Sequence, residues 1–445
     1  MTAVTKQPFD PGPAAWNEIL PAATAFDSLA SDFQADVLVI GGGFAGLSAA
    51  RRLKQLQPDA TVAVVDARRI AEGPAGRNSG FMIDLPHNLA SRDYAGDADR
   101  DRSQTALNRE AIAFAADAAQ EYGMSEEAFS PSGKINAAAT GRGVAHNNDY
   151  AAHLQAMGEA HELLDAKAMQ DICGSGYYLG GLYTPGTAML QPALYVRGLA
   201  AGLAGSGVLL FENTPVVALA REGRSWRAET PSGTISAGTV VLCVNGHAES
   251  FGYFKRRLMH IYLYASMTRS LSSEECAALG GQERWGFTPA DPLGTTVRRI
   301  SGTGGDRIVV RNRFTWAPGR SVAAQRPQSV AHVHDRSFSA RFPKLAGIDM
   351  EYRWGGLLCL SLNTAPAFGE LEPGLYSACC QNGLGTAAGT LSGKLIAEQI
   401  CGHESASLLA MQSLPAPKRL PPEPFASIGA NATMRWGEMR AGKEL

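Results

Sequence analysis

The stretch VLVIGGGFAGLSAARRLKQLQPDATVAVVD, residues 37–66, decides the fold of this chain. A short apolar run leads into a glycine-rich turn, a segment with apolar residues at helical spacing follows, and a β-branched run ends the stretch. A strand, a glycine turn, a helix and a second strand within about 30 residues are typical of a dinucleotide-binding βαβ unit. We therefore expect a Rossmann-type α/β domain that begins near residue 36.

Three glycines in the turn have the GxGxxG spacing, and each has a physical role. Gly41 permits the tight turn, Gly43 lets the backbone approach a pyrophosphate, and Gly46 lets the helix pack close to the strand. Phe44 and Ala45 lie where the helix begins and presents free N–H groups and its positive dipole end to phosphate.

Asp66 ends the second strand, where a carboxylate can accept hydrogen bonds from ribose hydroxyls. It would repel a 2′-phosphate, so NADP is disfavoured. Ala67 and Arg68 follow directly and are expected to line the same site. This motif alone does not decide between FAD and NAD.

The composition is that of a soluble globular enzyme, since 45% of the 445 residues are hydrophobic and 18% are charged. The length predicts two or three domains at roughly 100–200 residues per domain. A net charge of −2 provides no general attraction for nucleic acid or an anionic membrane. The seven cysteines are scattered without a CxxC pair, which argues against a metal or disulfide framework.

The N-terminal residues contain no apolar signal segment, and no stretch approaches the roughly 20 apolar residues of a membrane span. Reduced thiols are the simplest account of the unpaired cysteines. We therefore expect a cytoplasmic protein.

Two further glycine-containing segments accompany the first motif. GPAGRNSGF, residues 73–81, follows the second strand and offers backbone N–H groups to an anion or a ring edge. QNGLGTAAGT, residues 381–390, precedes a helical run near the C-terminal end. Taken alone, the first could be a surface turn and the second an ordinary helix N-cap.

With GTVVLCVNG at 238–246 and YRWGG at 352–356, these motifs resemble in content and order the glycine oxidase and D-amino-acid oxidase (DAO) family of FAD enzymes. The similarity is strongest to gamma-glutamylputrescine oxidoreductase-like members and covers nearly the whole chain. It implies FAD bound without a covalent link, with further contacts from Arg77, Asn78, Ser79, Gly80, Val216, Asn245, Gly246, Asn382, Gly383, Leu384, Gly385 and Thr386. Backbone N–H groups of the last five would stabilise negative charge on reduced flavin.

The resemblance also implies a discontinuous architecture. Residues 36–100, 190–252 and 350–405 would form the FAD-binding domain, and residues 101–189 and 253–349 an antiparallel-sheet substrate domain. Residues 1–35 would form an arm on the domain surface, and the Pro-rich tail, residues 406–445, would be extended. Helices are expected at 103–122 and 150–169.

Members of this family oxidise a C–N bond by hydride transfer to flavin N5, giving an imine that hydrolyses. The implied partners are a small amine substrate and either oxygen or another electron acceptor. A general base is not required if the amine binds neutral. His87 and His260 lie nearest the family's site segments, but a hydrogen-bonded structural histidine is the simpler interpretation. Covalent attachment to flavin through Cys359, Cys379 or Cys380 is an alternative to free binding.

The YRWGG segment departs from the amino-acid oxidases, in which an arginine on this strand clamps the substrate α-carboxylate. Here the clamp position falls on Trp354 or Gly355, and the neighbouring Arg353 would point to the other face of the strand. We therefore expect an amine or an N-substituted amino acid as substrate.

Tyr262 and Tyr264 lie on one face of a predicted strand at 258–268. They either line the substrate pocket, with Trp354 and His260, or pack between the sheet and its helices. Two other functions remain open: an NAD-dependent dehydrogenase, and an FAD-containing subunit of a larger dehydrogenase complex.

Overall fold

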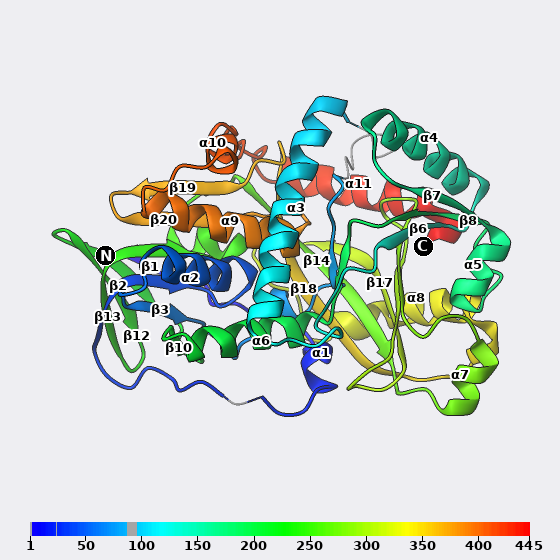
Figure 1. Ribbon diagram of the computed structural model, residues 1–445, viewed down its shortest axis with the longest axis horizontal. Helices are drawn as coiled ribbons and strands as arrows, with labels where there is room; N and C mark the ends of the chain where they lie inside the picture. Colours follow the sequence, from blue (N-terminus) through cyan, green and yellow to red (C-terminus); the bar gives the residue numbers. More distant parts are fainter. Residues whose placement is uncertain (1, 24, 87–95) are drawn as a thin grey trace.

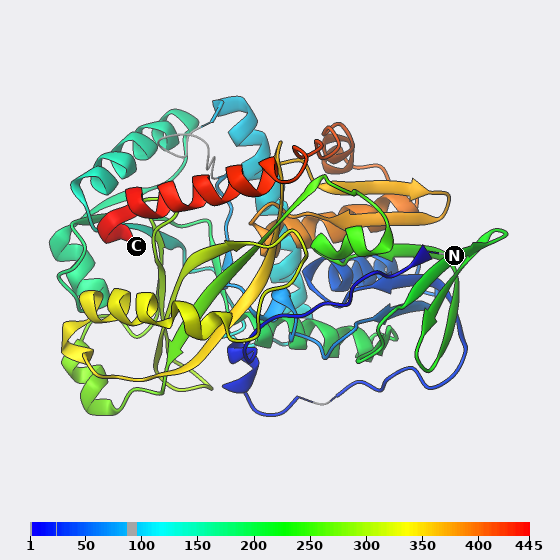
Figure 2. The ribbon, with the colours of Figure 1, turned by 180° about the vertical axis from the view of Figure 1, so that it is seen from behind.

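The computed structural model describes residues 2–23, 25–86 and 96–445 and contains two large β-sheets in two lobes (Figure 1). The reverse view shows the same division, with the N-terminal strand in one lobe and the C-terminal helix across the other (Figure 2). A helix-covered sheet with a parallel centre and a second, largely antiparallel sheet confirm the predicted mixed α/β fold class. His87 lies outside the described residues.

The first sheet forms around the predicted βαβ unit, whose strands β2 and β3 are parallel. β10 and β13 extend this parallel centre on either side, and β11 and β12 continue it antiparallel to an edge covered by β1. The strands are β1 (Thr2–Ala3), β2 (Phe33–Ile40), β3 (Val62–Val65), β10 (Leu209–Phe211), β11 (Ala218–Glu222), β12 (Ser225–Thr230), β13 (Gly233–Leu242), β19 (Ala367–Glu372) and β20 (Leu375–Cys379).

Helices cover one face of the first sheet because alternate strand residues are buried against them. Val37 and Val39 pack with these helices, whereas Leu38 and Ile40 pack into the core on the opposite face. The helices are α2 (Phe44–Leu56), α3 (Ala98–Glu121), α6 (Pro192–Gly205) and α9 (Gly385–Ile400). α3 stands across the seam between the lobes and contacts helices of both (Figure 1).

The second sheet has the order β18-β14-β17-β16-β15-β6-β8-β7, and all its pairs are antiparallel except β15 with β6. Its strands are β6 (Lys134–Ala138), β7 (Glu162–Asp165), β8 (Gly180–Thr184), β14 (Leu258–Thr268), β15 (Trp285–Pro289), β16 (Thr296–Ile300), β17 (Arg307–Trp316) and β18 (Met350–Ser361). A small sheet of β4 (Phe81–Met82), β9 (Ala188–Leu190) and β5 (Phe129–Ser130) accompanies the two large ones.

The remaining helices accompany the second sheet or lie in the arm and the C-terminal region. They are α1 (Ala15–Glu18), α4 (Gly141–Met157), α5 (Ala166–Cys173), α7 (Ser273–Leu279), α8 (Arg326–Arg341), α10 (Ala406–Gln412) and α11 (Phe425–Ala441), with 3-10 turns at η1 (Pro74–Gly76), η2 (Asn245–Phe251), η3 (Pro343–Leu345) and η4 (Gly442–Glu444). Among the described residues, no helix has the length and apolarity to cross a membrane.

Two predicted elements differ from the structure. The helix expected at 150–169 is wrong: α4 ends at Met157, because Gly158 takes a left-handed conformation (φ 79°), and β7 and α5 follow. The Pro-rich tail is extended only between α10 and Phe425, after which α11 runs for 17 residues along β17. Its prolines precede the helix, where they interrupt no helical hydrogen bond.

Two elements cross the predicted domain boundaries. The predicted FAD-binding domain includes residues 350–361, yet β18 pairs with β14 along its whole length in the second sheet. The predicted substrate domain includes most of α3, yet the buried alanines of this helix belong to the core that contains α2 and α9. The rest of the division stays a prediction.

α9 depends on close contact with α2. A Cβ at Gly393 would lie 2.0 Å from the backbone oxygen of Ala45. We expect Gly393→Ala to lower the free energy of unfolding by about 1–3 kcal/mol through overpacking, measured by urea denaturation. In the exposed helix α11, a Cβ at Gly429 would meet no atom within 4 Å, so Gly429→Ala should be neutral or stabilise by about 0.5–1 kcal/mol. Equal effects of the two changes would contradict this packing.

Candidate functional site

The glycine-rich turn has the conformation that its sequence requires. Gly41 has φ 111°, and a Cβ there would lie 2.5 Å from the oxygen of Cys243. A Cβ at Gly46 would lie 1.8 Å from the oxygen of Gly41, whereas one at Gly43 would meet only Ala75, at 3.4 Å. The turn therefore packs closely against backbone atoms at Gly41 and Gly46, and it has more room at Gly43, where α2 begins.

Phe44 and Ala45 are the first two residues of α2. The Phe44 side chain packs in the core, whereas the backbone of both residues forms the start of the helix. The Phe44 ring stacks on Tyr195 in the core, with centroids 5.8 Å apart. The 13-residue helix begins at N-cap Gly43 without a side-chain cap among the described residues. Its first N–H groups are thus free to bind an anion.

Asp66 lies beside this turn. Its Oδ2 accepts a hydrogen bond from the N–H of Gly42 (2.8 Å), and its Oδ1 accepts one from the N–H of Arg68 (2.9 Å), across Ala67. Burial raises the pKa of the Asp66 carboxyl to about 6, against the lowering effect of these two hydrogen bonds. The carboxylate is thus part of the turn as well as a candidate ribose ligand.

The raised pKa makes a pH test possible. The folded state holds the Asp66 proton more tightly than the unfolded chain, so the stability contribution is complete below about pH 4 and is lost as the pH rises through about 6. Relative to Asp66→Asn, the wild-type protein should lose up to roughly 3 kcal/mol of unfolding free energy across this window. Denaturation at pH 4 to 7, with exposed Asp59→Asn as control, measures it; a flat difference would contradict the assignment.

The second glycine loop, residues 381–390, contacts the predicted cofactor-binding segment at residues 73–81. Asn382 (φ 49°) and Gly383 (φ 88°) form its turn, and α9 begins after Leu384 without a side-chain cap in the described structure. The Thr386 hydroxyl donates to the oxygen of Phe81 (2.7 Å), which joins this loop to residues 73–81. A Cβ added at Gly385 would meet no atom of the described residues within 4 Å, so these residues leave room beside the helix start.

Asn245 and Gly246 adjoin the same loop. The Asn245 side-chain oxygen accepts from the N–H of Cys380 (3.2 Å), and the oxygen of Gly246 lies 3.1 Å from Nε2 of His260. Burial lowers the pKa of His260 to about 4, so its ring is neutral near pH 7. His260 thus packs against η2 as a structural histidine.

Val216 follows a segment that contacts Asp66. Thr214 donates its N–H to the oxygen of Asp66 (2.8 Å), which brings this segment beside the end of β3. The oxygen of the buried Val216 accepts from the Gln7 side chain (2.9 Å), so the arm covers this position.

The loop at 73–81 is held by its own side chains. Asn78 donates to the oxygen of Ala75 (2.6 Å) and accepts from the N–H of Gly80 (2.8 Å). Gly80 has φ 74° and leaves room for the Arg298 guanidinium, which donates to the oxygen of Ser79 (2.8 Å). These hydrogen bonds fix the loop as a turn, and its backbone groups are what it offers to a ligand.

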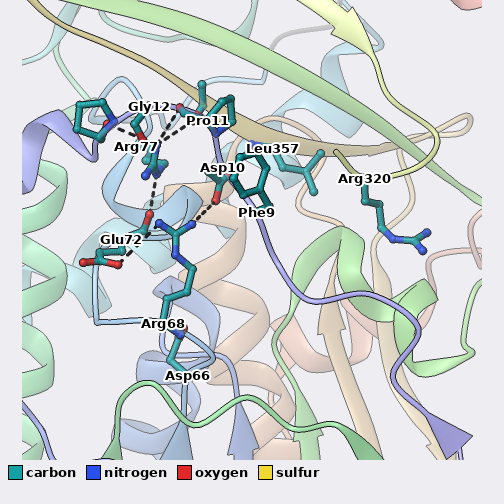
Figure 3. Close-up of polar contacts among 12 residues, drawn as sticks. Phe9, Asp10, Pro11, Gly12, Asp66, Arg68, Glu72, Arg77, Arg320 and Leu357 are labelled. Carbon is teal, nitrogen blue, oxygen red and sulfur yellow. Dashed lines mark hydrogen bonds and ion pairs between the residues drawn. The ribbon is translucent and has the colours of Figure 1, made fainter. Parts of the chain in front are cut away.

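Arg77 has a structural task that the sequence did not reveal. Its buried guanidinium donates to the oxygens of Glu72 (2.6 Å), Gly12 (3.0 Å) and Gly355 (3.2 Å), and at longer range to those of Pro11 and Pro13 (Figure 3). Its side chain thus binds the arm and β18 to the loop. Burial lowers the Arg77 pKa to about 10, which leaves the group charged at neutral pH.

The arm itself is fastened at the same point. Asp10 accepts a hydrogen bond from the N–H of Leu357 (3.2 Å). It also pairs with Arg68 (3.2 Å), as Figure 3 shows. The N–H of Gly355 donates to Pro11 (2.8 Å), and the Trp16 indole donates to Asn78 (2.9 Å). The arm predicted on the surface is therefore partly buried between the two sheets.

Replacing Arg77 tests this fastening. Arg77→Met removes the donor shared by several buried or partly buried oxygens and should cost about 1–3 kcal/mol of unfolding free energy. The released arm should also be cut faster by trypsin after Lys6. Arg69→Met is the matched control, because Arg69 is half-exposed and reaches Glu72 only at 3.9 Å. If trypsin cleaves both variants at the wild-type rate, Arg77 does not hold the arm.

The substrate-pocket candidates separate onto two faces of the second sheet. Tyr262 and Tyr264 are buried with Val330 of α8, and the Tyr262 hydroxyl donates to Phe9 (2.6 Å). They pack between sheet and helix, the second of the two alternatives. Trp354 lies on the opposite face, where its indole donates to the oxygen of Arg77 (3.0 Å).

Arg353 points away from the glycine loops. It pairs with Asp335 of α8 (2.6 Å) and donates to the Ser266 hydroxyl (3.0 Å). The Trp354 side chain faces the loop instead.

The face of the second sheet that carries Trp354 also carries two charged residues that were not predicted from the sequence. Lys134 on β6 and Arg298 on β16 are both buried. Burial lowers the pKa of Lys134 to about 8 and that of Arg298 to about 9. The available signal was a cation inside a short apolar strand, in KINAA and TVRRI.

These features fit a bound FAD. Two helices of 13 and 16 residues begin at glycine loops, and neither start has a side-chain cap from the part of the chain that the structure describes. Gly389 of α9 approaches Phe44 of α2, so both starts lie together. The partly buried carboxylate of Asp66 lies beside the start of α2. Burial raises the pKa of the Cys379 thiol to about 11, which keeps it protonated rather than nucleophilic.

The fold and these paired helix starts define a dinucleotide-dependent oxidoreductase. Residues 36–399 match the family described as DAO, FAD dependent oxidoreductase. The chain belongs to this family, and FAD, rather than NAD, is its cofactor.

Three known proteins show the extent of the similarity. A probable oxidoreductase OrdL from Rhizobium meliloti is 27% identical over 426 residues, covering 92% of this chain and 94% of the relative. Gamma-glutamylputrescine oxidoreductase from Escherichia coli is 26% identical over 392 residues, covering 85% and 86%. The structure of glycine oxidase from Geobacillus kaustophilus superposes with a TM-score of 0.70 at 18% identity, covering 88% and 100%.

Proposed function

We propose that this protein oxidises the C–N bond of an amine or an N-substituted amino acid. The observation that carries the proposal is the orientation of YRWGG: Trp354 faces the Arg77 loop, while Arg353 is turned away and paired with Asp335. A simple α-amino acid would lack the arginine that holds its carboxylate on this strand. One relative is named for gamma-glutamylputrescine, an amine.

The predicted residues of the glycine turn and of the 73–81, 245–246 and 382–386 segments would contact FAD. When bound, FAD would supply a two-electron acceptor for a hydride from the substrate carbon bonded to nitrogen. The substrate imine left by that oxidation would be hydrolysed by water to an aldehyde or ketone and an amine. Oxygen or another electron acceptor would restore the oxidised cofactor.

The protein's own residues position the substrate and exclude water. Phe81, Ile83, Met189 and Leu384 form a small apolar cluster between the 73–81 loop and the start of α9. An amine held neutral against this cluster needs no catalytic base, which agrees with the structural role of His260.

The test is anaerobic reduction of the purified yellow protein. We expect absorbance near ~450 nm to bleach with amines or N-alkyl amino acids and to respond weakly to simple α-amino acids. Trp354→Phe should keep the visible spectrum but change the concentration that half-saturates bleaching. Colourless protein that FAD cannot reconstitute would refute the proposal. A yellow protein that no compound in the panel reduces, but that co-purifies with a partner, would favour the subunit of a larger complex.

A further inference from the structure

A group of polar side chains is buried on the face of the second sheet that carries Arg298. The register pairs Lys134 with Thr184 and Asn136 with Thr288, so these four side chains share one face. Gly286, two residues before Thr288 on β15, pairs with Arg298. The group is therefore continuous with the residue that binds the 73–81 loop.

Lys134 has no acidic partner in the described structure. Its Nζ donates to the Asn136 side-chain oxygen (2.5 Å) and lies 3.5 Å from the Thr288 hydroxyl, while its side chain is almost completely buried. Asp84 is the acid that influences it, but that carboxylate is bound by Arg109 (3.0 Å). A buried ammonium without a paired anion is costly, which points to a missing ligand.

Two unsatisfied atoms of Asn136 and Thr184 are able to donate. Within the described residues, Asn136 Nδ2 and Thr184 Oγ1 are buried and have no hydrogen-bond partner, although both residues are 0% exposed. Lys134 directs two of its three protons to Asn136 and Thr288, which leaves one donor. An ammonium, an amide N–H and a hydroxyl from adjacent positions of β6 and β8 suit the two oxygens of a carboxylate.

The group lies one layer of apolar side chains from the glycine loops. A Cβ at Gly286 would lie 2.2 Å from Met189 and 2.8 Å from the Phe81 ring. Both belong to the apolar cluster that also contains Leu384 at the start of α9. An extended molecule could therefore have one end at this cluster and the other at Lys134.

We propose that Lys134, Asn136 and Thr184 bind a carboxylate at the end of the amine substrate remote from the oxidised carbon. The substrate class would then be an amine that carries a carboxylate several bonds from its reacting nitrogen. This inference rests on the proposed function for its placement within a substrate. The carboxylate site itself can be tested separately.

The first experiment compares 5-aminopentanoate with 5-aminopentanamide, which differ in charge at the remote end. In anaerobic bleaching of the FAD-bound enzyme, the acid should half-saturate at a concentration roughly 10- to 100-fold below that of the amide. Lys134→Met should abolish this difference by weakening the acid alone. Lys167→Met, an exposed lysine paired with Asp171 on α5, is the control and should retain it. Equal weakening of both compounds in Lys134→Met would overturn the proposal.

Asn136→Asp is a second variant that does not depend on the tolerance of the fold for methionine. It places a carboxylate beside Lys134 in the same space, so the internal anion should replace the external one. We expect higher thermal stability together with loss of the preference for the acid. A variant that keeps the wild-type preference would overturn the proposal.

A readout without turnover separates this site from the proposed function. Glutarate, which has no amine to oxidise, should perturb the visible spectrum of the oxidised protein or raise its melting temperature, and Lys134→Met should remove the effect. If no amine bleaches the protein but glutarate acts through Lys134, the site stands and the proposed function fails. If glutarate has no effect on the wild type, or the same effect on Lys134→Met, the site is refuted.

Discussion

The buried guanidinium of Arg77 is the contact on which the arrangement of the two lobes depends. It binds backbone oxygens from the arm, from its own loop and from β18, which belong to three distant parts of the chain. An arginine cannot shed its charge at neutral pH, so burial is tolerable only because these oxygens surround it. The loop beside the cofactor site is thereby joined to the second sheet.

The glycine turn and the strands of the βαβ unit could be predicted from the local sequence. Gly41 and Gly46 must be glycine whatever the rest of the chain does, since a side chain there would strike backbone atoms. The strand β14 lies at its predicted bounds, residues 258–268, because its residues alternate between clear turns. In contrast, the arm's burial depends on partners such as Leu357 that no local pattern identifies.

The candidate site was predictable to the same degree and for the same reason. The period of a strand correctly placed Tyr262 and Tyr264 together, but it could not say which face turns towards α8. That choice depends on how the sheet packs, and it put both tyrosines in a core. Lys134 was not predicted, because a lysine is usually exposed and the sequence alone does not show which strands pair beside it.

The two-residue strand β1 protects more backbone than its length suggests. It pairs with β11 at the edge of the first sheet, and the N–H of Val4 continues the ladder to Val217. An uncovered edge strand is a template on which a second molecule can add a strand of its own. The same arm that lies between the two sheets therefore also hinders strand addition by a second molecule at this edge. A mutation that releases the arm should cause aggregation as well as a loss of stability.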